Sequence, residues 1–252
     1  MTSSGFDTNL SLLQWRPSPL EMLRHVLTEA NLARHWGDEP SRVLDVAGGN
    51  GVTAVRLATQ GHEVTVLDPA GAMLSTAIQA AEAHGVADRL HVVQAAAQDA
   101  PEVFDGHEFD LVLCHNLLHY TAEAAERQEV LRAVMAPLRP GGLLSVLGPN
   151  EHFGPVQAVV RDRAPDLALA ELLAEAGEWS EPLTVGELVA SLATLGVQEV
   201  VRYGVRCVSD LVSEEDAENP AFMADLELLE IALSSRMPYL LTARFYHLIA
   251  RR

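Results

Sequence analysis

Two hydrophobic periods alternate along most of this chain of 252 residues. Short, nearly continuous apolar runs predict buried strands, and segments with a 3.6-residue period between them predict amphipathic helices. Strands are expected at 42–47, 63–68, 90–94, 109–114 and 142–148, and near 197–207 and 242–250. Helices are expected at about 51–60, 71–85 and 122–136. This alternation predicts an α/β fold with a seven-stranded, mostly parallel sheet and helices on both faces.

An amphipathic helix precedes the predicted sheet. It covers residues 20–36, and its apolar stripe consists of Leu20, Leu23, Leu27 and Ala30. The segment 37–40 is rich in turn-forming residues and ends it. We therefore divide the chain into an N-terminal helical segment, 1–39, and a main domain, 40–252.

Two acidic segments interrupt the main domain. Residues 150–183 contain two arginines and seven acids, and they are expected to form an inserted helical lid. Residues 209–237 contain eight acids and one arginine, and they are expected to form a second helical cap. Its helix would turn three leucines inward: Leu226, Leu229 and Leu233. Between the two segments, Thr184 and Glu187 form a capping box that opens a helix to about residue 195.

The charge balance narrows the choice of partners. The chain has 17 basic and 35 acidic residues, a formal net charge of −18, and every basic residue other than histidine is arginine. Such a surface repels polyanions, which argues against DNA and anionic membranes as partners. No apolar run is long enough to span a membrane, and the first 14 residues lack a targeting pattern. The two cysteines have no metal-site spacing, so we expect a cytoplasmic protein without a metal.

A loop of small residues follows the first strand. Asp45 stands two residues before it, Ala47, Gly48 and Gly49 form it, and a helix begins soon afterwards. Small residues let a ligand approach the backbone, and the first turn of the helix presents free N–H groups to it. Asp68, at the end of the next strand, is placed to accept hydrogen bonds from ribose hydroxyls. These features predict a nucleoside-binding unit.

The spacing in this loop favours S-adenosylmethionine over a dinucleotide. The dinucleotide pattern G-x-G-x-x-G requires glycine where this chain has Ala47 and Val52. The carboxylate of Asp45 would repel a pyrophosphate, whereas it would favour the ammonium group of an amino acid.

Further polar residues follow the third and fourth predicted strands. Asp99 could accept from the adenine amino group while a backbone amide meets a ring nitrogen, or it could only cap the short turn that follows. Met73 could touch the adenine face or pack beneath its helix. His115 fits a ligand contact and a structural role equally well, whereas His119 fits a side chain that lines a pocket better than a catalytic one.

Taken together, residues 40–150 resemble the class I S-adenosylmethionine-dependent methyltransferases, including the turn Leu138-Arg139-Pro140-Gly141-Gly142. The resemblance implies a Rossmann-like fold, S-adenosylmethionine as the cofactor and S-adenosylhomocysteine as its product. Within this family, the chain is similar over nearly its full length to the bacterial tRNA 5-carboxymethoxyuridine methyltransferases. The matching segments are Gly61-His62, Ala80-Ala81-Glu82-Ala83, Ala96-Ala97-Gln98-Asp99, Gly204-Val205-Arg206 and 239–251.

The resemblance implies a role for individual residues. Ala47 and Gly48 would line the methionine part of the cofactor, Asp68 would bind the ribose, and His115 would lie at the cofactor's rim. The adenine would contact Ala97 and Gln98, and the methionine carboxylate would pair with Arg24.

Two features depart from the family's pattern. Ala47 replaces the usual first glycine, which is acceptable if its φ is negative. The lysine-rich segment associated with the tRNA enzymes is replaced by an acidic one at 161–183, which removes a phosphate-binding surface.

Methyl transfer requires that the nucleophile, the methyl group and the sulfur be aligned and that water be excluded. A hydroxyl or protonated amine acceptor also needs a general base, and the candidates are His115 and His119. We favour a monomeric or homodimeric enzyme that methylates oxygen or nitrogen of a small molecule, with the acidic lid selecting a neutral or cationic acceptor. One alternative is a tRNA wobble-uridine methyltransferase, and another is a protein that binds the cofactor without transferring methyl. A contiguous patch at the cleft mouth would favour tRNA, and its absence would argue against tRNA; the patch would comprise Arg161, Arg163, Arg202 and Arg206.

Overall fold

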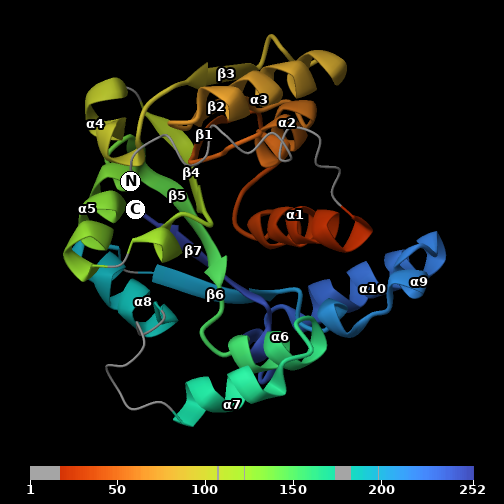
Figure 1. Cartoon of the computed structure of the whole chain (residues 1–252). Helices are drawn as coiled ribbons and strands as arrows, with labels where there is room; N and C mark the ends of the chain where they lie inside the picture. The colour runs from red at the N-terminus through yellow and green to blue at the C-terminus, as the bar shows by residue number, and fades with distance from the viewer. Residues whose placement is uncertain (1–17, 107, 122, 174–182, 198) are drawn as a thin grey trace.

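The computed structural model describes residues 18–252 apart from 107, 122, 174–182 and 198 (Figure 1). Its sheet has seven strands in the order β3-β2-β1-β4-β5-β7-β6. The strands are β1 (Arg42–Val46), β2 (Glu63–Leu67), β3 (Leu90–Val93), β4 (Phe109–His115), β5 (Leu138–Pro149), β6 (Glu199–Val205) and β7 (Phe245–Arg251). Strand β7 runs antiparallel to β5 and β6, and the other pairings are parallel. The predicted seven-stranded, mostly parallel sheet is confirmed.

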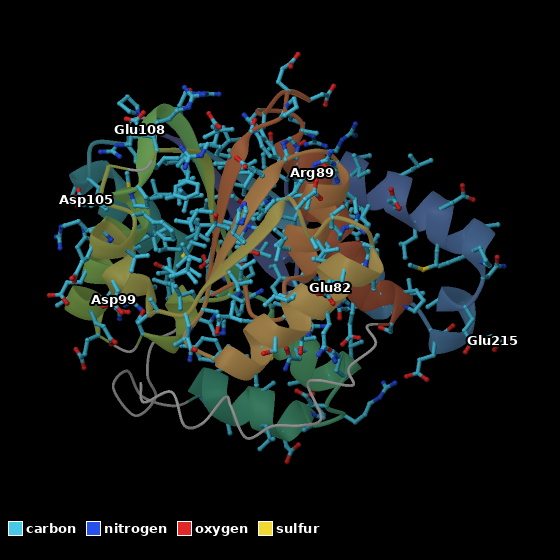
Figure 2. All side chains as sticks on the ribbon, turned by 90° about the horizontal axis from the view of Figure 1, so that it is seen from above. Glu82, Arg89, Asp99, Asp105, Glu108 and Glu215 are labelled. Carbon is cyan, nitrogen blue, oxygen red and sulfur yellow. The ribbon has the colours of Figure 1, made fainter. Side chains whose placement is uncertain are left out.

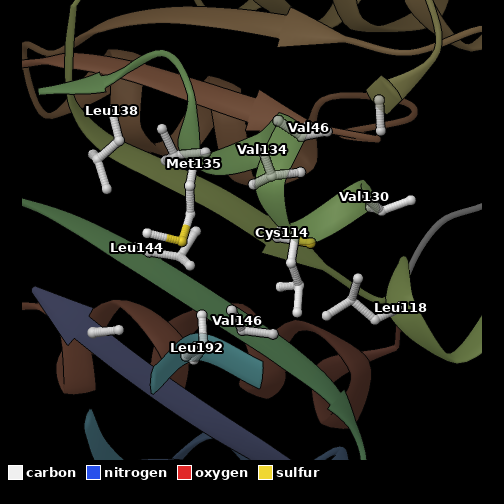
Figure 3. Close-up of a cluster of buried hydrophobic side chains, with 14 of the residues drawn as sticks. Val46, Cys114, Leu118, Val130, Val134, Met135, Leu138, Leu144, Val146 and Leu192 are labelled. Carbon is white, nitrogen blue, oxygen red and sulfur yellow. The ribbon is translucent and has the colours of Figure 1, made fainter. Parts of the chain in front are cut away.

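Helices cover both faces of the sheet, as the sequence predicts (Figure 1). One face carries α1 (Pro19–Leu32), α2 (Val52–Thr59) and α3 (Gly71–Ala83). The other carries α4 (Ala100–Val103), α5 (Ala124–Met135) and α8 (Val185–Thr194). Alternate strand residues supply the two cores, since Val43 packs toward α2 and α3 whereas Leu44 packs toward α5 and α8. Figure 3 shows the second core, in which Cys114 of β4 and Val146 of β5 meet Val134 of α5.

Helix α1 packs against the main domain. Its N-terminus is closed by a capping box between Ser18 and Glu21. Leu23 and Leu27, two members of the predicted stripe, lie in a third core cluster, while Leu32 joins the core beneath α2. The helix ends at Leu32, a few residues before the predicted end, and residues 1–17 of the predicted N-terminal segment lie outside the described part.

Both acidic segments are helical where the structure describes them. The predicted lid contains α6 (Gly154–Val160) and α7 (Pro165–Leu173), and its residues 174–182 are not described. The predicted second cap contains the 3₁₀ turn η5 (Ser209–Leu211), α9 (Glu214–Ala217) and α10 (Pro220–Leu233). Figure 1 places α6 and α7 beyond the carboxyl end of β5, with α10 nearby. The helix expected after the lid is confirmed as α8, which opens with the capping box of Thr184 and Glu187.

The inner face of α10 differs from the prediction. Leu226 is buried, but Leu229 is 48% exposed. The inner position one residue later belongs to Glu230, which is 1% exposed. Its carboxylate accepts hydrogen bonds from the backbone N–H groups of Cys207, Val208 and Ser209 at 2.6–2.9 Å. The predicted stripe is confirmed at Leu226 and wrong at Leu229, because a carboxylate that caps a turn takes the inner position.

The predicted turn before the fifth strand lies inside β5. The register between β4 and β5 shifts there, from the pair Phe109 and Leu138 to the pair Leu111 and Leu143. Gly141 adopts a φ of +76°, a conformation that suits glycine. Within the described residues, no helix is both long and apolar enough to cross a membrane.

Candidate functional site

A cavity of about 600 Å³ lies where the carboxyl ends of β1, β2 and β4 meet. The sheet order reverses direction between β1 and β4, and such a switch point is where open α/β sheets bind ligands. The cavity size falls in the range of small-molecule sites. Loops that follow four strands line it, together with Arg24 and His25 of α1 and the first turn of α2.

The glycine loop passes directly over Asp45. A Cβ atom at Gly48 would lie 2.7 Å from the carboxyl carbon of Asp45 and 2.9 Å from a methyl of Val66. A side chain there is excluded, so the bare backbone forms this wall of the cavity. Gly51 has a φ of +73°, and a Cβ there would lie 2.6 Å from that of Ala77, so this glycine lets α2 pack on α3.

Ala47 adopts a left-handed conformation with a φ of +56°. The condition under which alanine would fit this position without strain, a negative φ, is therefore not met. Its backbone N–H donates to the carbonyl of Leu67 at 2.7 Å, which ties the loop to β2 and sets the turn. An alanine in this region costs about 1 kcal/mol relative to its preferred conformations. The loop keeps the shape that a glycine would adopt freely.

Asp68 is held at the rim of the cavity by backbone groups. One carboxylate oxygen accepts from the N–H of Gly49 and the other from the N–H of Ala70, both at 2.9 Å. The side chain lines the cavity and is mostly buried. Asp68 thus links the glycine loop to the start of α3.

Asp45 is the buried acid beneath the loop. Burial, with a smaller contribution from the negative charge of Asp68, raises the pKa of the Asp45 carboxyl to about 7. The carboxylate therefore forms at a cost that a cationic group in the cavity would offset. Cys114 lies nearby, and burial together with Asp45 raises the pKa of its thiol to about 12, so this thiol stays protonated.

Arg24 brings a positive charge to the same cavity from α1. Its guanidinium donates to Nε2 of His25 at 3.2 Å, and Nδ1 of His25 lies 2.9 Å from the hydroxyl of Thr53. The guanidinium also lies 5.7 Å from the ring centre of Phe245. Among the described residues, no carboxylate forms a salt bridge with Arg24. Burial and the charge of Arg244 lower the pKa of Arg24. This is a cation suited to an anionic ligand group.

The far end of the cavity is lined by Met73, Ala97 and Gln98. Ala97 and Gln98 belong to the 3₁₀ turn η3 (Ala97–Asp99). Asp99 does not line the cavity. Its carboxylate accepts from the N–H of Ala96 at 3.1 Å, and its side chain lies at the periphery of the molecule (Figure 2). Asp99 therefore caps η3, the turn in which it lies, and not the turn that follows, with which its side chain makes no cap hydrogen bond.

The two candidate bases differ in position. His115 lines the cavity at the end of β4, and its Nε2 lies 2.7 Å from the hydroxyl of Ser145. Burial, followed by the effect of His247, holds its pKa well below the usual value. His119 is exposed on the 3₁₀ turn η4 (Leu118–Tyr120), outside the cavity lining, where its ring packs 4.0 Å from that of Tyr120. Of the two candidates, His115 lines this cavity and His119 does not.

Several lining residues do not stand out in the sequence. They are His25, Asn50, Val52, Thr53, Pro69, Ala70, Ala96, Asn116, Leu117, Tyr120, Thr121, Glu126 and Val130. Asn116 carries the one signal that was available, since asparagine tolerates left-handed backbone and its φ is +53°. Within the described residues, no group of three or more His, Cys, Asp or Glu side chains could hold a metal ion.

The four arginines proposed as a tRNA patch do not form one exposed surface. Arg161 and Arg163 are exposed. Arg206 is 6% exposed and pairs with Asp210 at 2.9 Å. Arg202 is partly buried and donates to the side-chain oxygen of Asn150 at 3.3 Å. Two of the four guanidiniums therefore serve internal contacts.

Comparison with known proteins identifies the class of this chain. Residues 43–142 match a family model described as a methyltransferase domain. The chain is 32% identical to the tRNA 5-carboxymethoxyuridine methyltransferase of Escherichia coli K12 over 232 residues, which cover 86% of this chain and 82% of that protein. The chain belongs to the class I S-adenosylmethionine-dependent methyltransferases, which the fold and the glycine loop also indicate.

Solved structures share the fold at lower identity. The plantazolicin methyltransferase BamL, in complex with S-adenosylhomocysteine and a substrate analogue, is 13% identical with a TM-score of 0.54, and the match covers 93% of this chain and 84% of that one. The [4+2]-cyclase SpnF is 18% identical with a TM-score of 0.58, covering 90% of this chain and 80% of that one. The fold alone therefore does not specify the reaction.

Proposed function

We propose that this enzyme binds S-adenosylmethionine in the cavity and transfers its methyl group to oxygen or nitrogen of a small-molecule acceptor. One observation carries the cofactor assignment. A partly buried guanidinium, which has no salt bridge to a carboxylate among the described residues, and a buried carboxyl of raised pKa line the same cavity beside a bare glycine loop. The amino-acid end of the cofactor carries the complementary pair of charges, a carboxylate and an ammonium group.

The other contacts follow from this orientation. Arg24 would pair with the cofactor's carboxylate, and Asp45 would favour its ammonium group across the loop of Ala47 and Gly48. Asp68 would meet the ribose hydroxyls. The adenine would then lie against Met73, Ala97 and Gln98. The bound cofactor would supply a methyl group already activated on a sulfonium.

The remaining task of the protein is to position the acceptor and exclude water. Arg24 is held by His25, which Thr53 holds in turn, so the amino-acid end of the cofactor would be bound by a preorganised group. Helix α6 lies beyond the carboxyl end of β5 with α10 nearby, a placement that would suit an enclosing cap.

The charge distribution supports a small acceptor over a nucleic acid. The protein carries a formal net charge of −18, and Arg206 and Arg244 are engaged with Asp210 at 2.9 and 2.7 Å. A polyanion would meet a repulsive surface, because acidic residues outnumber basic ones, 35 to 17.

A tRNA uridine acceptor is the second candidate, and one specific observation favours it. The similarity to the Escherichia coli tRNA enzyme covers 86% of this chain, a share too large to be confined to the matched domain at 43–142. A carboxylate acceptor of that kind needs no general base, in keeping with a cavity histidine of lowered pKa.

Binding of S-adenosylhomocysteine tests the cofactor assignment. Asp68→Ala should weaken binding measured by calorimetry at least tenfold, about 1.4 kcal/mol, because the ribose loses its acceptor. Asp88→Ala is the matched control and should bind like the parent protein, because Asp88 is exposed and lies just before the amino end of β3. Equal affinities in two folded variants would refute the ribose assignment.

The acceptor is tested separately with methyl-labelled S-adenosylmethionine. Cell extract is divided into a small-molecule ultrafiltrate and purified total tRNA, and each is incubated with the enzyme. Label in the ultrafiltrate supports the proposal. Label in tRNA uridine refutes it and establishes the second candidate, and the absence of label from both favours a cofactor-binding protein that transfers no methyl.

A further inference from the structure

A chain of buried polar side chains runs from the cavity through the sheet to helix α1. Nε2 of His115 lies 2.7 Å from the hydroxyl of Ser145, which lies 2.8 Å from Nε2 of His247. Nδ1 of His247 lies 3.5 Å from the amide nitrogen of Asn31. Ser145, His247 and Asn31 are each at most 1% exposed. Polar groups so deep in an apolar sheet call for a specific explanation.

The hydrogen-bonded side chains from His115 to Asn31 share a limited number of protons. Burial lowers the pKa of His247 to about 3 and holds that of His115 well below its usual value, so both rings are neutral near pH 7. A neutral imidazole has one N–H donor and one acceptor nitrogen, and a serine hydroxyl has a single proton. A proton assigned at one end of this row of hydrogen bonds therefore determines the histidine tautomer at the other end.

Asn31 sets the direction because its amide nitrogen can only donate. Nδ1 of His247 then accepts, and the proton of this ring lies on Nε2, which donates to the hydroxyl oxygen of Ser145. The serine proton in turn points to Nε2 of His115. That nitrogen is an acceptor, so the ring proton of His115 lies on Nδ1.

We propose that Asn31, His247 and Ser145 are positioning residues that hold His115 in the Nδ1–H tautomer. His115 then presents a hydrogen-bond donor to the cavity and does not act as a general base. Its partner would be a lone pair on the bound molecule, such as a hydroxyl, carboxyl or ether oxygen. The link to methyl transfer rests on the proposed function, whereas the tautomer itself belongs to the protein without a ligand.

Nitrogen NMR of the full chain labelled with ¹⁵N-histidine tests the tautomer directly. We expect His115 to show a protonated Nδ1 and a bare Nε2. His62 provides an internal reference, because its Nδ1 accepts from the backbone N–H of Ser41 at 3.3 Å and its proton must lie on Nε2. A His115 proton on Nε2 in the parent protein would overturn the proposal.

Two variants test the relay. Asn31→Leu removes the donor that sets the direction, and Ser145→Ala removes the link, so each should convert the single His115 tautomer into a mixture. In the Ser145→Ala background, adding Asn31→Leu should change His115 no further, because Asn31 acts through the serine. Ser234→Ala, at another serine only 1% exposed, is the matched control and should leave the His115 tautomer unchanged.

The result separates the relay from general damage. An unchanged His115 tautomer in folded Asn31→Leu and Ser145→Ala proteins would refute the proposal, as would an equal response to Ser234→Ala. Calorimetry with S-adenosylhomocysteine on the same parent sample keeps the two proposals distinct. Absence of binding would refute the proposed cofactor while the tautomer result stands.

Discussion

Cofactor binding should depend on pH through Asp45. The pKa of this carboxyl is raised to about 7 in the protein without ligand. A bound ammonium group favours the ionised form, so binding near neutral pH should release a proton. With a pKa of about 7, lowering the pH from about 7.5 to about 5.5 reduces the ionised fraction about 25-fold, which corresponds to about 2 kcal/mol. Affinity for S-adenosylhomocysteine should fall by a similar factor.

The two histidines that line the cavity do not change their protonation in this pH range. The pKa of His25 is lowered to about 3, and that of His115 lies well below its usual value, so neither imidazole in the cavity gains a proton between pH 5.5 and 7.5. The ligand's α-amino group, with a pKa of about 7.7–8.0, stays mostly protonated over the same range. Asp45 is therefore the cavity group expected to control the profile.

Calorimetry of S-adenosylhomocysteine binding from pH 5.5 to 7.5 measures this dependence. The Asp45→Asn variant should bind with a flat profile, close to the low-pH affinity of the parent protein. Adenosine, which lacks the amino-acid group, should bind the parent protein with a flat profile. A parent profile that is itself flat, or one that persists in folded Asp45→Asn, would refute the role of Asp45.

As the pH rises, the stability of the unliganded protein should fall, whereas its affinity for the ligand should increase. A raised carboxyl pKa in the folded state means that the unfolded chain ionises first, so stability declines as the pH rises from about 3.8 to about 7. The shift corresponds to about 4 kcal/mol at most. Asp45→Asn should therefore be more stable than the unliganded parent protein in urea unfolding at pH 7.5, while the two converge at pH 4.

Three further substitutions test individual contacts. Ala47→Gly removes the left-handed strain and should raise the free energy of unfolding by about 0.5 kcal/mol, which is about 1 kcal/mol of strain less the entropy of glycine. The urea midpoint should rise accordingly, and a lower midpoint contradicts this. Arg24→Met should weaken S-adenosylhomocysteine at least tenfold and leave adenosine unchanged, and an equal loss for both ligands would argue against the carboxylate contact. Glu230→Gln turns an amide toward the N–H of Cys207 and should cost about 2 kcal/mol in unfolding, whereas exposed Asp225→Asn on the same helix should cost almost nothing.

Local patterns were sufficient for the sheet and for the glycine loop. Short, nearly continuous apolar runs that alternate with helical periods favour strands covered on both faces, so their order along the chain implied the layers. Asp68 could be placed beside the loop because parallel strands bring their carboxyl ends to one edge. The strained φ of Ala47 was missed, since the hydrogen bond to Leu67 that holds it comes from the neighbouring strand.

The face of α10 shows the limit of periodicity. Leucine spacing assigned Leu229 to the interior, but Glu230 occupies the inner position because three backbone N–H groups of a distant turn compensate its burial. A pattern of apolar residues carries no information about such a partner.

By itself, the sequence determined the class of the protein, because the strand pattern, the loop spacing and Asp68 are all read within about 30 residues of one another. Only the tertiary structure decided which other side chains complete the site. Helix α1 supplies Arg24 and a route to His115, through contacts between residues 28, 102 and 216 positions apart. Pairs so distant leave no periodic signal, since their positions depend on how the whole sheet packs. For the same reason, the direction of the proton on His115 follows from the fold and not from the motif in which it lies.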